Sequence, residues 1–339
     1  MTSMRAAVLR DVHDVTIEER PIPTPGPDEV LVRVGSVGIC GSDVHYYESG
    51  RIGPYVVDKP LVLGHEAGGE VVEVGERVLG LRAGQRVSLE PGVPCRSCQQ
   101  CRAGRYNLCP GVQFFGTPPF DGALCEYVSM PADFVYPVPD ALSDDAAGLL
   151  EPLSVAVWAC RLGSVSAGSR VLVTGAGPIG LIAAQTAFAF GAADVVVTDV
   201  NPQRLAAAEQ LGARTLDVST TAVEDSGFVP DVLLECSGNA RATSAAVRTV
   251  APRGRVILIG MGSDEVSLSL PYLQNHELTV QGVFRYANTW PTAIALAASG
   301  AVQLDQLVSR HFGLDAVEEA LTVHRQDPSA LKVVVRPGE

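Results

Sequence analysis

The residues best suited to chemistry are a cysteine, a histidine and a glutamate that stand beside glycines. Cys40 follows the apolar stretch 30–39, and His65 and Glu66 follow a second apolar stretch at 60–64. A thiolate and an imidazole are good zinc ligands, and a carboxylate or a water can complete the tetrahedron. Three protein ligands would leave one position open for an alcohol oxygen. From these residues alone, a buried structural cysteine and a hydrogen-bonded structural histidine are an equally good interpretation.

Four more cysteines form a tight group in a loop rich in glycine, proline and arginine. Their spacing is Cys95-x2-Cys98-x2-Cys101-x7-Cys109. Four thiolates can close a tetrahedron without an open position, which is typical of structural zinc. Iron–sulfur clusters also use short cysteine spacings and are the alternative. We expect this group to stabilise its loop and to take no part in catalysis.

A third pattern, within residues 171–185, predicts a nucleotide site. A short aliphatic run breaks into Gly-x-Gly-x-x-Gly and is followed by an apolar helical pattern. The glycines allow a tight turn, the approach of a pyrophosphate and close packing of the helix, whose N-terminus attracts phosphate. Asp199 ends the next strand and favours NAD through the ribose hydroxyls, whereas Arg204 nearby keeps NADP open. The expected cofactor-contacting residues are Gly175, Gly177, Pro178, Ile179, Gly180, Asp199 and Arg204.

The elements that must position these residues fall into two classes. Residues 1–90 read as short strands with glycine and proline turns, which predicts an all-β, barrel-like unit. After residue 170 strand and helix patterns alternate, which predicts a parallel sheet with helices on both faces. The fold class is therefore α/β. Residues 140–148 predict a helix start that continues through Glu151, an acid in an apolar run that is either a helix-start carboxylate or a buried acid near the metal. Cys125, Cys160 and Cys236 are expected in cores.

Composition narrows the function classes. The chain has 339 residues and a net charge of −13, which argues against nucleic-acid or anionic-membrane partners. The sequence contains no run of about 18 uninterrupted apolar residues, so it predicts no membrane span. The N-terminal residues become polar too soon for a signal peptide, so we expect a cytoplasmic protein.

Together the motifs resemble the zinc-dependent medium-chain dehydrogenases of the alcohol dehydrogenase superfamily, over nearly the whole chain. The stretches that look specifically like the sorbitol (polyol) dehydrogenases are 38–46, 64–67, 104–110, 151–155 and 282–291. The resemblance implies a GroES-like β-barrel catalytic domain over 1–152, with 285–339 returning to it, and a Rossmann-type doubly wound parallel sheet domain over 153–284. It also implies a homotetramer, with a dimer as the alternative. Animal members lack the four clustered cysteines, so bacterial or fungal members are the nearer match.

The resemblance also implies site roles. Cys40 and His65 would bind a catalytic zinc, with Glu66 and a water completing its coordination. Glu151 matches a residue that contacts the metal-bound water. The positions that match the lining of the polyol pocket are Ser42, Tyr46, Phe114, Arg285 and Tyr286.

The implied reaction oxidises a polyol's secondary hydroxyl to a ketose and transfers a hydride to NAD. The proton would leave through the zinc water and Glu151, or through Ser42 and the ribose hydroxyl towards His45. Arg285 offers five donors to several hydroxyls at once. The alternatives are a dehydrogenase of another secondary alcohol, such as threonine or butanediol, and a catalytically silent protein that binds zinc and nucleotide.

Overall fold

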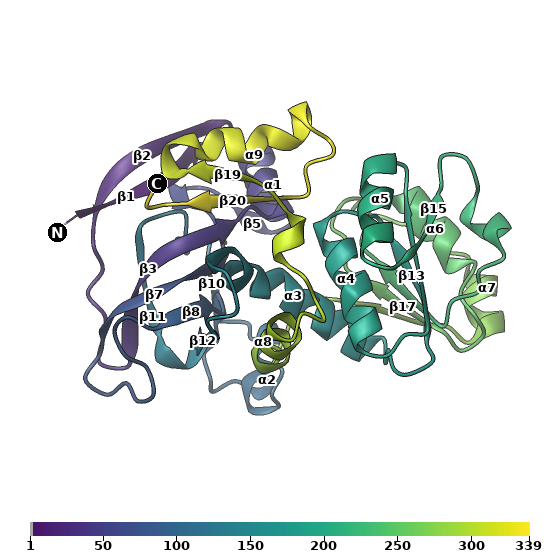
Figure 1. Ribbon diagram of the computed structural model, residues 1–339, viewed down its shortest axis with the longest axis horizontal. Coiled ribbons are helices and arrows are strands. Elements are labelled where there is room, and N and C mark those ends of the chain that lie inside the picture. The colour runs from purple at the N-terminus through teal and green to yellow at the C-terminus, as the bar shows by residue number, and fades with distance from the viewer. Residues whose placement is uncertain (1–2) are drawn as a thin grey trace. The chain divides into compact units, whose positions relative to one another are not determined.

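A computed structural model describes residues 3–339, which divide into two compact units (Figure 1). The first unit comprises the chain up to Glu151 together with Leu304–Glu339, and the second comprises Pro152–Gln303. Helix α3 (Asp144–Leu162) runs through the change from one unit to the other. The predicted change after residue 152 lies next to the observed one. The chain returns to the first unit at Leu304, however, and not at residue 285.

The later return has a physical cause in the contacts of helix α8 (Trp290–Ala298) and its flanks. The guanidinium of Arg161, near the end of α3, donates to the Asn288 carbonyl and to Thr292 Oγ1, both at 2.8 Å. At the far end of the segment, the Gln303 N–H donates to Gln185 Oε1 at 2.7 Å. These bonds attach the segment 285–303 to the second unit.

The second unit is a six-stranded parallel sheet with the strand order β15-β14-β13-β16-β17-β18. The strands are β13 (Arg170–Thr174), β14 (Asp194–Asp199), β15 (Arg214–Asp217), β16 (Val232–Glu235), β17 (Arg255–Leu258) and β18 (Thr279–Gly282). The remaining helices are α4 (Pro178–Ala189), α5 (Pro202–Gln210), α6 (Ala240–Val247) and α7 (Leu270–His276). This is the doubly wound order, with α4 and α5 on one side of the sheet and α6 and α7 on the other (Figure 1). The predicted Rossmann-type fold is confirmed.

The first unit is built mainly from strands. Its strands are β1 (Ser3–Asp11), β2 (Asp14–Pro21), β3 (Glu29–Gly38), β4 (Arg51–Ile52), β5 (Tyr55–Val56), β6 (Leu61–Val62), β7 (Glu66–Val74), β8 (Arg86–Leu89), β9 (Gly92–Val93), β10 (Gln113–Phe114), β11 (Tyr127–Pro131), β12 (Val135–Pro137), β19 (Val308–Gly313) and β20 (Lys332–Arg336). Its helices besides α3 are α1 (Gly41–Ser49), α2 (Gln99–Arg102) and α9 (Val317–Gln326), and a short 3-10 turn, η1, covers Tyr106–Leu108. Aliphatic residues of β1, β3 and β7 contribute to its core.

Strand register in the first unit determines where the chemistry gathers. In the antiparallel pair β3–β7, Gly38 lies opposite Glu66. On the other edge of β3, Val334 of β20 also lies opposite Gly38. The end of β3, the start of β7 and the last strand of the chain therefore meet at one place. Among the helices of residues 3–339, none has the length and apolar character needed to cross a bilayer.

A buried carboxylate fastens α3 to this sheet. Asp145 is 7% exposed and accepts from Ser36 Oγ at 2.9 Å, His311 Nε2 at 2.7 Å and Arg336 Nη2 at 3.0 Å. Burial by itself would raise the pKa of Asp145, but the hydrogen bonds from His311, Arg336 and Ser36 outweigh it and hold the pKa below its ordinary value.

We therefore expect Asp145→Asn to lower the free energy of unfolding at pH 7 by about 1–3 kcal/mol. A carboxylate with a depressed folded-state pKa stabilises the fold above its unfolded pKa of about 4, and this stabilisation disappears as the pH falls through the lower folded value. The difference between variant and wild type should thus shrink in acid, which denaturant unfolding at pH 7 and pH 3.5 would measure. A difference that is constant with pH would argue against this role.

Candidate functional site

The predicted catalytic ligands come together at the meeting point of β3 and β7. Cys40 follows β3 and is the N-cap residue of α1, His65 precedes β7, and Glu66 is its first residue. One ligand atom from each of the three lies within 4.8 Å of the others. His65 and Glu66 are buried and Cys40 is half-buried. Glu66 belongs to the strand itself, since its pairing with Gly38 extends β7 back to it.

Asp43 orders this cluster and was missed by the sequence analysis. Its carboxylate is fully buried, accepts from the Cys40 N–H at 2.9 Å and from the Gly64 N–H at 3.0 Å, and lies 3.7 Å from His65 Nδ1. Burial raises the pKa of Asp43, and nearby His65 and the two N–H groups partly offset this rise. An acid three residues after a helix N-cap is the spacing of a capping box, and this signal could have identified Asp43.

The electrostatics of the cluster suit a cation. Burial alone would lower the pKa of His65, but the negative charges of Asp43, Cys40 and Glu151 raise it to about 10. Within residues 3–339, Glu66 Oε2 is buried and has no hydrogen-bond donor. A thiolate, an imidazole and a carboxylate with a spare oxygen form a donor set that fits zinc.

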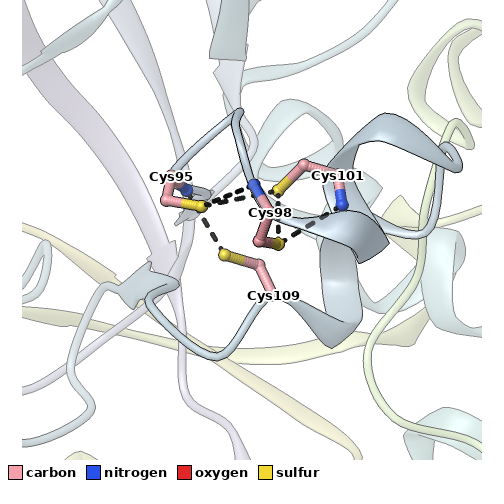
Figure 2. A group of neighbouring side chains, drawn as sticks. All are labelled: Cys95, Cys98, Cys101 and Cys109. Carbon is pink, nitrogen blue, oxygen red and sulfur yellow. Dashed lines mark hydrogen bonds between the residues drawn. The ribbon is translucent and has the colours of Figure 1, made fainter.

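The four-cysteine group is also gathered, in the loop between β9 and β10 (Figure 2). The Cys98 and Cys101 sulfurs are 3.4 Å apart, and those of Cys95 and Cys101 are 4.0 Å apart. Zinc–sulfur bonds of about 2.3 Å place tetrahedral sulfurs about 3.8 Å apart, whereas a disulfide needs about 2.05 Å. The four ligand atoms lie within 4.8 Å of one another, which fits one ion better than a multi-iron cluster.

Backbone donors support thiolates in this loop. The N–H of Cys95 donates to Cys109 Sγ at 3.3 Å, and the N–H of Cys98 donates to Cys95 Sγ at 3.4 Å (Figure 2). Hydrogen bonds from Ser97 and Cys98 lower the pKa of the Cys95 thiol to about 6. The short helix α2 and the turn η1 bring the last two cysteines back to the first two.

In the second unit, the glycine turn lies at the carboxyl end of β13. Gly175 has φ +85°, which favours glycine, and a Cβ there would stand 3.0 Å from Ser237 Cα. A Cβ on Gly180 would overlap the Gly175 carbonyl oxygen, so glycine is needed for helix α4 to pack. Gly177 is the N-cap of α4, Pro178 is the first residue of that helix and Ile179 is the second. A Cβ at Gly177 would have Arg204 Nη1, at 4.0 Å, as its nearest neighbour, which leaves room for a pyrophosphate.

Asp199 ends β14 beside this turn. One carboxylate oxygen accepts from the Ala176 N–H at 2.7 Å, and the other accepts from the N–H groups of Val200 and Asn201 at 2.8 Å. Asp199 therefore holds the glycine turn in place. Arg204 on α5 brings a cation to the same region.

The other predicted residues are distributed between the two units. Phe114 is buried, with its ring centroid 5.4 Å from that of His65. On α1, Ser42 is half-buried, His45 is exposed and Tyr46 lies in the core. Glu151 is buried in the third turn of α3, so it is not a helix-start carboxylate.

Arg285 and Tyr286 belong to the second unit. Tyr286 packs edge-on against Trp290 at a centroid distance of 5.2 Å, and the Arg285 guanidinium carbon lies 4.8 Å from the centroid of the Phe284 ring. Cys125 and Cys160 are buried in cores as expected, whereas Cys236 is half-buried.

Comparison with known proteins identifies the family. Residues 26–140 match the alcohol dehydrogenase GroES-like domain, and residues 178–299 match the zinc-binding dehydrogenase domain. Sorbitol dehydrogenase from Bacillus subtilis (strain 168) is 43% identical over 99% of this chain and 98% of its own length. The chain belongs to the zinc-binding dehydrogenase family. Mouse sorbitol dehydrogenase is 44% identical over 97% of this chain and 94% of its own.

Solved structures of dehydrogenases agree with this assignment. An Escherichia coli dehydrogenase of unknown specificity has a TM-score of 0.95 and 35% identity, covering 98% of this chain and 99% of its own. One from Sinorhizobium meliloti 1021, bound to NADP, has a TM-score of 0.91 and 31% identity, and an alcohol dehydrogenase from E. coli CFT073 with NADH has 0.92 and 30%. Each of these two covers 99% of this chain and 100% of its own. The protein is thus an oxidoreductase with the predicted GroES-like and Rossmann-type domains, and zinc and a nicotinamide cofactor fit its family.

Proposed function

We propose that this chain is an NAD-dependent polyol dehydrogenase that oxidises a secondary hydroxyl of a sorbitol- or xylitol-type polyol to a ketose. The observation that carries the proposal is the meeting of Cys40, which follows β3, with His65 and Glu66 at the start of β7, with ligand atoms within 4.8 Å. The near full-length similarity to sorbitol dehydrogenases supports the substrate class.

In this proposal Cys40, His65 and Glu66 hold the catalytic zinc. When bound, zinc supplies a Lewis acid that makes the substrate hydroxyl easier to deprotonate. Asp43 keeps the protein groups in place, because its carboxylate holds the Cys40 and Gly64 backbone and faces His65. The cysteines Cys95, Cys98, Cys101 and Cys109 would hold a second, structural zinc.

The proton released from the substrate needs a path to solvent. Of the two predicted routes, we favour the one through Ser42 and His45, because His45 is exposed one turn along α1 from the ligand Cys40. Glu151 is buried, and its charge acts on His65. We propose that Glu151 contacts the water beside the metal. Tyr46, Phe114, Arg285 and Tyr286 stay our predicted substrate-contacting residues.

The cofactor is proposed to be NAD. We expect Asp199→Ala to lower the preference for NAD over NADP, measured as the ratio of kcat/KM values, by about tenfold, the free energy of one charged hydrogen bond. The ratio is the useful quantity, because loss of the bonds to Ala176 and Asn201 would weaken both cofactors alike.

A matched control for this variant is Asp217→Ala. Asp217 also ends a strand, β15, and lies in register with Asp199. It bonds to Ser219 and not to the glycine turn. The control should leave the cofactor ratio unchanged. An unchanged ratio in Asp199→Ala would remove Asp199 from cofactor selection.

The function is tested by NADH formation from NAD with the zinc-loaded protein and four substrates in parallel: sorbitol, xylitol, threonine and ethanol. We expect turnover of both polyols and little turnover of threonine or ethanol. Turnover of threonine or ethanol alone would keep the zinc chemistry but contradict the roles of Arg285 and Tyr286. Bound zinc and NAD without turnover of any alcohol, butanediol included, would favour the silent binding protein.

We further propose a cytoplasmic homotetramer. The acidic net charge of −13 fits an enzyme without a nucleic-acid partner. Sedimentation analysis of the zinc-loaded protein would distinguish a tetramer from a dimer.

A further inference from the structure

The last strand of the chain begins with a buried cation. Lys332 opens β20 and is 4% exposed. Its Nζ donates to Glu66 Oε1 at 2.6 Å and to the Ile39 carbonyl at 2.9 Å. The same ammonium group thus touches one proposed metal ligand and the peptide next to another, Cys40. The two partners are separated from Lys332 by 266 and 293 positions in the chain.

Stability alone is a weak explanation for this pair. The ion pair is nearly inaccessible to solvent, with side-chain exposures of 4% for Lys332 and 1% for Glu66. Desolvating two charges costs much of what their attraction returns, so apolar residues of similar volume often serve a core as well. The backbone bond between the Ile39 N–H and the Val333 carbonyl already joins β20 to the end of β3. Lys332 is therefore not needed to attach β20 to β3. What needs an explanation is why a charged group stands at this buried position.

The second oxygen of Glu66 has a different environment. Among the described residues Oε2 has no hydrogen-bond donor, although it is buried. It lies over Gly38, where a Cβ would overlap it. The carboxylate is therefore held at one oxygen by Lys332, and Gly38 leaves space for the other. A carboxylate with one oxygen bound to a lysine and the other unbound can coordinate a metal through the second oxygen alone.

We propose that Lys332 is a positioning residue for the metal site: it holds Glu66 Oε1 so that Oε2 remains available as the single oxygen ligand. The inference rests on the proposed function, because it requires the metal to be held by Cys40, His65 and Glu66. It assigns to the last strand of the chain a role in metal coordination. Groups that orient a ligand in this way typically contribute 10–100-fold to metal affinity or activity.

The test uses Co²⁺ in place of zinc in the full-length protein, because the visible spectrum of Co²⁺ reports its ligands and coordination number. Subtracting the spectrum of cobalt-loaded Cys40→Ser, in which only the four-cysteine site binds, isolates the site at Cys40. We expect Lys332→Met to change this difference spectrum and to weaken zinc binding there about 10–100-fold in competition with a chelator. Lys332→Arg keeps a cation at this position, so its difference spectrum and its zinc affinity should lie closer to those of the wild type.

Two further variants separate positioning from folding. Arg336→Met removes another cation of β20, one that pairs with Asp145 and Glu339, so it should lower stability but leave the difference spectrum unchanged. Gly38→Ala displaces Oε2 instead of releasing Oε1, and it should also change the difference spectrum. This variant keeps the test possible if Lys332→Met does not fold.

The outcomes are distinguishable. Wild-type difference spectra and zinc affinities in both Lys332→Met and Gly38→Ala would overturn the positioning role and leave the proposed function standing. A wild-type protein with no cobalt signal beyond that of Cys40→Ser would overturn the proposed metal site, and this inference with it. A changed spectrum in both variants, but not in Arg336→Met, supports the inference.

Discussion

Replacing Cys40 by serine is expected to lower kcat/KM for polyol oxidation by about a thousandfold or more. Zinc as a Lewis acid supplies several kcal/mol of transition-state stabilisation, and each 1.4 kcal/mol is tenfold in rate. A serine hydroxyl is a much poorer ligand than a thiolate. NAD affinity should persist, because the glycine turn belongs to the other unit. NADH formation, zinc content and a cofactor titration would measure these three quantities.

The matched control is Cys125→Ser. Cys125 is buried in the core of the same unit and belongs to neither group of candidate metal ligands. Its replacement should lower stability without changing the zinc content or the kcat of the folded protein. If Cys40→Ser kept its turnover within threefold of wild type, Cys40 would not be a ligand of the catalytic metal.

Replacing Cys109 by serine is expected to affect stability far more than catalysis. Cys109 is the buried member of its group and closes the loop that begins at Cys95. Structural zinc contributes about 10 kcal/mol or more in small zinc-folded domains, so we expect the loss of several kcal/mol here. Bound zinc should fall from two ions per chain to one, while kcat of the folded fraction stays within threefold. Elemental analysis, denaturant unfolding and initial rates at low temperature would check this.

The Cys109 result also distinguishes the two readings of the four-cysteine group. Iron without zinc in the wild-type protein, together with visible absorption that Cys109→Ser abolishes, would favour the iron–sulfur alternative. A fall in kcat as large as that of Cys40→Ser would contradict a purely structural role.

The local sequence pattern was sufficient to predict most elements of the second unit. The strands around Val171, Val195 and Val232 are aliphatic runs between helical patterns, and these became β13, β14 and β16. Strand β15 is not evident from the sequence, because Arg-Thr-Leu-Asp is too polar and too short to stand out. It forms because β14 offers it a parallel edge. Helix α7 is not evident either, since its seven residues, none of them buried, give little periodicity.

The residues of the proposed metal centre could be chosen from the sequence, but the residues that hold them in place could not. Cys40 and His65 carry a recognisable chemistry in their own types and in neighbouring glycines. Lys332 carries no such signal, because a single lysine at the start of an apolar strand is usually exposed to solvent. Only the pairing of β20 with β3, across almost the whole chain, brings it to Glu66. Similarly, the place where the chain leaves the nucleotide-binding unit depends on the bonds of Arg161 and Gln185, which no local pattern encodes.

Anomalous diffraction at the zinc edge, from crystals of a preparation whose sorbitol oxidation has been measured, would show directly whether the proposed catalytic zinc is present. We expect two peaks per chain, one bounded by Cys40, His65 and Glu66 and the other at the centre of the four cysteines. A preparation that oxidises sorbitol at full rate with no metal peak beside Cys40, His65 and Glu66 would contradict the proposal.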